Sequence, residues 1–73
     1  MAQMIAIFMP LLNEGTDVWR PVNAERLGPD TFRVIGPEPD HEEWMFTPGT
    51  IVRAIAKQFD DGKEGIVAIA LST

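Results

Sequence analysis

Near its middle the chain reads Leu27-Gly28-Pro29-Asp30-Thr31-Phe32-Arg33-Val34-Ile35, the clearest indication of its fold. Residues 31–35 are mostly of types that favour β-strands. They follow Leu27 across a short Gly-Pro-Asp turn, which is typical of a hairpin with a loop of about three to five residues. The stretch therefore predicts two antiparallel strands joined by a tight turn.

The strand before this turn is predicted over residues 18–27. Alternation along a strand places Val18, Val22 and Ala24 on one face and Trp19 on the other. Trp19 is thus the candidate outward residue, although a local bulge at Pro21 would return it to the core. Since Pro21 cannot donate a ladder hydrogen bond, the strand is expected to lie at a sheet edge there or to carry that bulge.

Further strands are predicted on both sides of this hairpin. Residues 4–9 and 65–71 are apolar on both faces of a two-residue repeat, and residues 43–46 read as a strand with two aromatic residues on one face. Clusters of turn-forming residues separate these runs, at residues 13–15, 36–40, 48–49 and 60–62. The chain is therefore punctuated into short segments of strand length.

Residues 51–59 fit two structures. Ile51, Ile55 and Phe59 recur at helical spacing, which allows a helix and an α+β fold. Against a helix, β-branched residues crowd the start of the segment, and Asp60-Asp61-Gly62 before another apolar run is typical of a hairpin loop. A strand is the favoured interpretation.

These segments predict an all-β fold of five to six short antiparallel strands. In a chain of 73 residues they are too few for a sandwich of two full sheets, so a small, strongly bent or closed barrel is expected. No repeat, linker or shift in composition divides the chain, and residues 1–73 are expected to form a single small β-barrel domain.

Composition narrows the class of protein. The chain has no cysteine, so neither disulfides nor thiolate metal ligands are available. A formal net charge of −5 repels a phosphate backbone, which makes nucleic acid a poor partner. No run of residues matches a signal peptide or approaches the length of a membrane span, about 20 residues. We therefore expect a cytoplasmic protein that binds neither nucleic acid nor membrane.

Two parts of the sequence resemble a group of short, uncharacterised bacterial proteins. The first is Leu11-Leu12-Asn13-Glu14-Gly15-Thr16-Asp17-Val18-Trp19-Arg20-Pro21-Val22; the second comprises Glu42-Glu43-Trp44 with Phe46, Pro48-Gly49, Val52-Arg53 and Asp61-Gly62-Lys63. The resemblance implies a bacterial source and no known activity. The layout of strands and loops also resembles Src-homology-3-like (SH3-like) barrels, a fold that hosts many unrelated functions. Its peptide-binding versions dock proline-rich ligands on exposed aromatic residues.

The candidate binding residues fall into two groups. Trp and Arg are enriched among interface hot spots, so Thr16, Asp17, Trp19 and Arg20 could form a partner-binding patch, although residues 14–17 also have the short side chains that turns use. The second group is the acidic loop from Glu38 to Glu43, with Glu42 and Glu43 as its candidate contacts. The leading hypothesis is a non-enzymatic protein-binding module that recognises another protein through Trp19, Arg20 and this acidic loop. A sharper version is an immunity or antitoxin-like inhibitor that presents the acidic loop to a basic nuclease.

Two other functions stay open, and a third is not expected. Asp40, His41 and Glu43 could serve a metal- or small-molecule-responsive accessory domain, although no second histidine joins them and no cofactor is expected. The chain could be a structural subunit of a homo-oligomer. An enzyme is not expected, because the only histidine lies in a polar loop and the only serine, Ser72, lies beside the chain end.

Self-association is the remaining expectation. Residues 4–9 and 65–71 are apolar on two faces, while a small barrel covers only the inner one. The uncovered face would form an exposed apolar patch, which often marks an interface. Pairing of these strands across a two-fold axis would bury the patch, and the sequence therefore predicts a homodimer.

Overall fold

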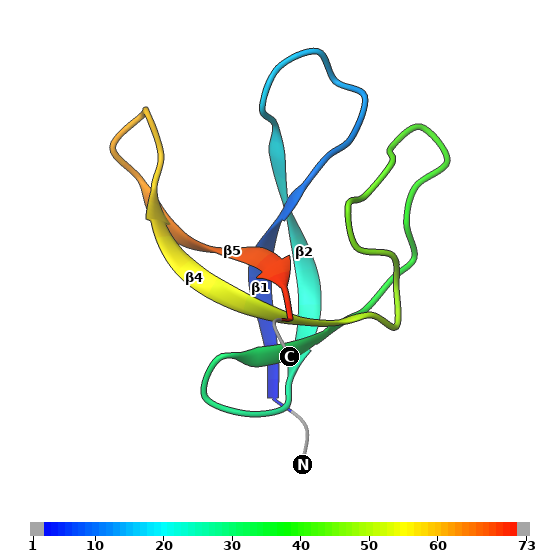
Figure 1. Ribbon diagram of the computed structural model, residues 1–73, viewed down its shortest axis with the longest axis vertical. Helices are drawn as coiled ribbons and strands as arrows, with labels where there is room; N and C mark the ends of the chain where they lie inside the picture. The colour runs from blue at the N-terminus through cyan, green and yellow to red at the C-terminus, as the bar shows by residue number, and fades with distance from the viewer. Residues whose placement is uncertain (1–2, 72–73) are drawn as a thin grey trace.

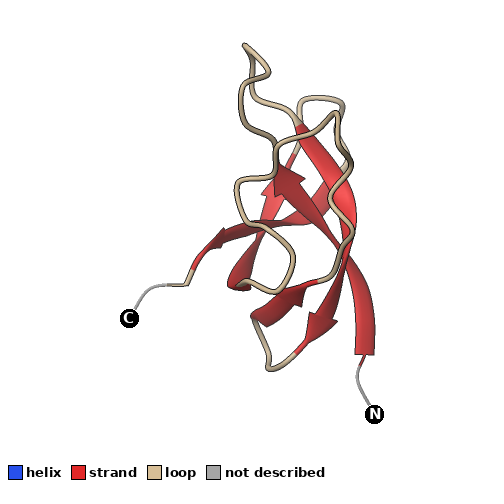
Figure 2. Cartoon of the chain, turned by 90° about the vertical axis from the view of Figure 1, so that its right-hand side faces the viewer, coloured by secondary structure: helices blue, strands red, loops and turns tan. Residues whose placement is uncertain are grey.

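The computed structural model describes residues 3–71, which form five β-strands and no helix (Figures 1 and 2). The strands are β1 (Gln3–Pro10), β2 (Trp19–Arg26), β3 (Thr31–Val34), β4 (Ile51–Gln58) and β5 (Glu64–Ala70). They follow one another in chain order and close into a barrel. The predicted all-β fold is confirmed, and the architecture is consistent with an SH3-like barrel.

The central hairpin is confirmed. β2 and β3 are antiparallel, with Ala24 opposite Val34, and the Leu27 amide donates to the Thr31 carbonyl oxygen across 2.8 Å. The turn is also tied to the next strand, because the Ala54 amide donates to the Asp30 carbonyl oxygen at 3.1 Å. Three strands thus meet at this turn.

Residues 51–58 form a strand, so the helix considered for this segment is wrong. β4 pairs with β5 in an antiparallel ladder that runs from Val52 opposite Ala70 to Gln58 opposite Glu64. The predicted hairpin loop joins the two strands, and Gly62 takes a φ of 86° there, in the left-handed region that favours glycine. β-branched residues and this turn prevail over the weak helical spacing.

Pro21 lies at an edge, as predicted, and without a bulge. The register of β1 and β2 is continuous from Gln3 opposite Arg26 to Pro10 opposite Trp19, with Phe8 opposite Pro21. β3 pairs only with residues 24–26 of β2, so Pro21 has a strand neighbour on one side alone. Trp19 therefore keeps the outward phase that simple alternation gives it.

The barrel closes through a parallel contact, which departs from the expected all-antiparallel order. Four ladders join consecutive strands antiparallel, and Phe8 of β1 then meets Val67 of β5 in parallel. The strand count dictates this outcome: when five strands alternate in direction, the first and the last run the same way. The closing seam is a single pair of residues.

The strand predicted over residues 43–46 is wrong. The segment makes one isolated bridge, between Trp44 and Leu11, flanked by hydrogen bonds from the Leu12 amide to the Glu43 oxygen and from the Met45 amide to the Pro10 oxygen. Turns that contain proline lie on either side of the segment and limit the length of the contact. The two aromatic residues do share a face, since Trp44 is buried and Phe46 packs against the same core.

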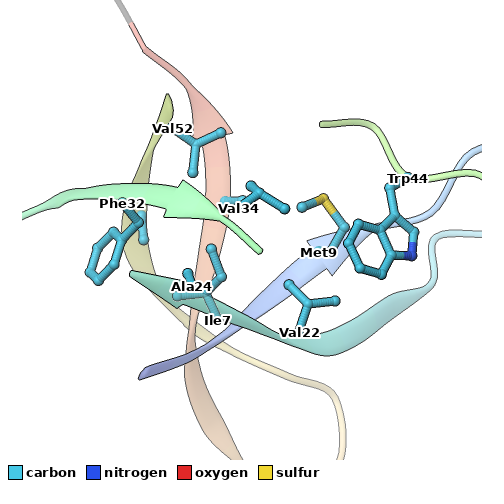
Figure 3. Close-up of a cluster of buried hydrophobic side chains, with 10 residues drawn as sticks. Ile7, Met9, Val22, Ala24, Phe32, Val34, Trp44 and Val52 are labelled. Carbon is cyan, nitrogen blue, oxygen red and sulfur yellow. The ribbon is translucent and has the colours of Figure 1, made fainter. Parts of the chain in front are cut away.

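The barrel interior is filled by side chains from all five strands and from Trp44. Figure 3 shows the Trp44 ring beside Met9 and Val22, with its indole nitrogen turned away from Met9. The buried cluster consists of Ile7, Met9, Val22, Ala24, Phe32, Val34, Trp44, Val52, Ala54 and Ala68. Val67 is also buried but lies outside this cluster, on the outer face with Phe8.

The connections define two ends of the barrel. In Figure 1 the loop between β1 and β2 and the turn between β4 and β5 project from one end, and the β2–β3 turn lies at the other. Between residues 3 and 71 no helix could cross a membrane.

Candidate functional site

Trp19 and Arg20 are adjacent in β2 and point to opposite faces of the barrel wall. Arg20 shares the phase of the buried Val22, and its guanidinium pairs with the carboxylate of Glu42 in the β3–β4 loop. Trp19 lies half-buried on the outer face. The predicted patch is therefore divided into two sites, one containing Thr16, Asp17 and Trp19, the other Arg20 and Glu42.

Three aromatic rings meet on the outer face of the barrel. The ring centroids of Phe8 and Phe59 are 4.7 Å apart, and those of Trp19 and Phe59 are 5.5 Å apart in an edge-to-face arrangement. Pairs with this geometry contribute about 0.5–1.5 kcal/mol beyond their buried area. We call Phe8, Trp19 and Phe59 the outer aromatic cluster. It brings together β1, β2 and the residue that follows β4.

A lysine covers part of this cluster. The Lys57 ammonium lies 5.0 Å from the ring centroid of Trp19 and 6.0 Å from that of Phe59. A cation over an exposed aromatic face is attracted by about 0.5–1 kcal/mol. Lys57 itself is exposed, so the contact is at the surface.

Two hollows adjoin the outer aromatic cluster, and together we call them the aromatic groove. The first, about 390 Å³, is lined by Phe8, Trp19, Pro21, Phe59, Asp61 and Lys63. The second, about 620 Å³, is lined by Thr16, Asp17, Trp19, Lys57, Phe59, Asp60 and Asp61. The groove thus has aromatic walls, and its second hollow has three carboxylates against one ammonium.

The predicted residues Thr16 and Asp17 belong to this groove. Both are exposed in the loop between β1 and β2, beside Trp19. The turn between β4 and β5 faces them and contributes Asp60 and Asp61. The two connections, far apart in sequence, therefore rim a single groove.

Arg20 and Glu42 serve a different purpose on the other face. Only 5% of the Glu42 side chain is exposed; its Oε1 accepts a hydrogen bond from Trp44 Nε1 at 2.9 Å, and its Oε2 pairs with Arg20. The Trp44 amide donates to Glu38 Oε2 at 3.1 Å. These carboxylates hold the β3–β4 loop against the barrel, so Glu42 is not a free acidic contact.

Glu43 is exposed and separate from both sites. Its carboxylate accepts a hydrogen bond from the Asn13 side-chain amide, which links the β3–β4 loop to the β1–β2 loop. The acidic loop predicted as one binding surface is therefore split between a buried anchor and an exposed link.

The residues considered for a metal do not converge. His41 Nε2 lies 3.7 Å from Glu42 Oε2, a carboxylate already shared by Arg20 and Trp44. Within residues 3–71 no group of three or more His, Asp or Glu side chains is placed to hold a metal ion. Asp40, His41 and Glu43, the residues of the metal-responsive alternative, are not assembled into such a group in the described part of the chain.

A third hollow, about 280 Å³, lies between β2 and the β3–β4 loop and involves Arg20, Pro37, Pro39 and Trp44. Its one aromatic residue, Trp44, is buried and its indole N–H is already bonded to Glu42. The aromatic residue of this hollow therefore has neither an exposed ring face nor a free hydrogen-bond donor for a partner.

Sequence reasoning missed the partners of Trp19. The sequence pattern places Phe59 in a segment that fits a helix or a strand, and Phe8 among the apolar residues of its strand, without linking either to Trp19. Strand alternation through Ile55, Lys57 and Phe59 is the signal that places a cation and an aromatic ring on one outer face. No sequence pattern predicts the strand register that brings the end of this segment beside Trp19.

Comparison with family models, with curated proteins and with solved structures finds no match to this chain.

Proposed function

We propose that this chain is a non-enzymatic protein-binding module of the SH3-like type, which holds an extended segment of a partner protein in the aromatic groove. The outer aromatic cluster carries the proposal. Its rings lie on the outside of a barrel whose interior is already filled by a separate set of side chains. A second group of aromatic residues, half-exposed beside two hollows, is what a peptide-docking surface requires.

The energetics of binding favour such a surface. Aromatic side chains bury large areas on contact while losing few rotatable bonds, and they are over-represented among the residues that dominate interfaces. The rings of Trp19 and Phe59 are already held in place by each other. A partner would therefore meet a preformed surface and lose little free energy to its ordering.

The histidine and the serine considered for catalysis lie outside the aromatic groove or outside the described residues. His41 is exposed and lies beside Glu42, whose carboxylate is shared with Arg20 and Trp44. Ser72 lies outside the described residues.

The test is selection of peptides from a randomised display library on the immobilised protein. We expect enriched peptides to bind the wild type and to lose at least tenfold in affinity for Trp19→Ala. The matched control is Leu27→Ala, which also removes an exposed apolar side chain, 44% accessible, from the β2–β3 turn at the other end of the barrel. Enrichment that fails, or peptides that bind Trp19→Ala as well as the wild type, would refute the proposal.

A homodimer is the second candidate, and it concerns a different surface. Met4 is 53% exposed on the outer face of β1, and Leu71, just after β5, is 43% exposed. Because a single residue pair joins β1 to β5, most of the facing edges of these two strands lack a partner. A second copy that covers these edges would bury both the backbone groups and the apolar side chains.

A further inference from the structure

The position of Lys57 is unusual among the charges around the aromatic groove. Three carboxylates line the same hollow, yet the Lys57 ammonium lies over the Trp19 ring. Among residues 3–71, no ion pair within 4.0 Å involves Lys57, Asp17 or Asp60. The ring face of Trp19 therefore already binds a cation of this chain, and we call this position the cation seat.

The cation seat on Trp19 is surrounded by more negative than positive charge. Asp17 comes from the β1–β2 loop, and Asp60 and Asp61 come from the β4–β5 turn. Asp61 is partly engaged, because its Oδ1 accepts a hydrogen bond from the Lys63 amide at 3.0 Å. Asp17 and Asp60 are left as exposed charges on either rim.

We propose that the aromatic groove recognises a basic side chain of the partner segment, lysine or arginine, which takes the place of Lys57 on the Trp19 ring. Lys57 is then a built-in competitor that leaves when the partner binds. This inference rests on the proposed binding function and specifies the chemistry of its partner. The incoming cation gains the ring face and the carboxylates of Asp17 and Asp60.

An acidic segment is the alternative, and the charges disfavour it. It could pair with Lys57 and Lys63, but it would approach three carboxylates on a chain whose formal net charge is −5. Like charges repel across a groove of this size, and the repulsion lowers both association rate and affinity. Arginine should be preferred over lysine, because its planar guanidinium stacks on aromatic rings.

One substitution should change the affinity of a basic peptide and of an acidic peptide in opposite directions. Lys57→Gln empties the seat, so the affinity of a basic peptide should rise about two- to fivefold, the equivalent of one surface cation–π contact. An acidic peptide would instead lose affinity, because its counter-charge is gone. Lys57→Arg, which keeps a cation over Trp19, is the matched control and should not raise affinity.

The experiment uses the peptides selected on the wild-type protein. We expect Arg or Lys to be enriched in them, their affinity to fall several-fold with added salt as screening predicts, and Asp17→Asn with Asp60→Asn to weaken binding while Asp40→Asn does not. In NMR spectra the Lys57 ε-methylene protons should lie upfield in the free protein, over the Trp19 ring, and move downfield at saturation.

The outcomes are distinct. Selected peptides that are neutral or acidic, or Lys57 resonances that stay upfield when a basic peptide saturates the groove, would overturn the inference and leave the binding module intact. Peptides that bind Trp19→Ala as tightly as the wild type would overturn both. A rise in affinity for Lys57→Gln, with no rise for Lys57→Arg, supports the competitor role.

Discussion

The ring of Phe8 lies across Gly65, so closely that a Cβ added at Gly65 would be 2.7 Å from Phe8 Cδ2. Gly65 stands opposite Lys57 in the β4–β5 ladder, and Phe8 stands opposite Pro21 in the β1–β2 ladder. The ring of Phe8 therefore packs directly on the backbone of β5 at Gly65, next to the ring of Phe59. Because Gly65 has no side chain, Phe8 can occupy this position in the outer aromatic cluster.

Gly65→Ala should consequently destabilise the protein and disturb the groove. Because the ring of Phe8 must move to admit the methyl group, we expect a loss of about 1–3 kcal/mol, as for other overpacked sites. Chemical denaturation followed by circular dichroism measures this free energy of unfolding. Selected peptides should also bind the folded variant more weakly, since Phe59 loses its neighbour.

Gly28→Ala is the control for this prediction. A Cβ at Gly28 would meet only Thr31, at ordinary contact distances of 3.7 and 3.8 Å, and the backbone there is not left-handed. We expect a change within about 0.5 kcal/mol, as for most surface substitutions. If both alanine variants unfold at the same denaturant concentration, Phe8 and Gly65 are not the close pair described.

The predictability of the fold and the site differs for a physical reason. The strands around residues 27–35 follow from local turn chemistry and alternation, and the structure confirms them. The loop at residues 43–46 does not, because Trp44 is held by Glu42 and Glu38 through hydrogen bonds that no local pattern encodes. Trp19 and Asp17 could be singled out as residue types, but Phe59 and Lys57 join them only through barrel closure.

Glu42→Ala should loosen the β3–β4 loop. The substitution leaves the buried Trp44 indole N–H without its acceptor and frees Arg20, which costs about 1–3 kcal/mol for an unsatisfied buried group. Hydrogen exchange of the Met45 amide, bonded to the Pro10 oxygen, should accelerate because that contact depends on the loop staying closed.

Glu43→Gln serves as the comparison for the loop. Gln keeps an oxygen that can accept from Asn13, and the site is exposed, so stability should change by no more than about 0.5 kcal/mol. Unaltered exchange of the Met45 amide in Glu43→Gln and faster exchange in Glu42→Ala is the expected pair of results. Equal exchange in the two variants would show that Glu42 does not anchor the loop.

Solution mass by light scattering across a dilution series tests the homodimer. We expect a mass near twice that of the 8.1 kDa chain at high concentration, falling toward the monomer on dilution. Met4→Glu should shift this equilibrium to monomer, because it places a charge on the outer face of β1. A monomer mass at every concentration would mean that these strand edges are not covered by a second copy.

Trp19→Ala decides whether the outer aromatic cluster serves binding or only stability. The ring is half-buried and loses one edge-to-face contact and one cation, so we expect a cost of about 1–2 kcal/mol. Phe32→Ala, which empties a core position that is 3% exposed, should cost about 3–5 kcal/mol. Thermal unfolding followed by circular dichroism compares the two variants. If Trp19→Ala lowers the free energy of unfolding as much as Phe32→Ala does, the Trp19 ring serves the stability of the fold and not the binding of a partner.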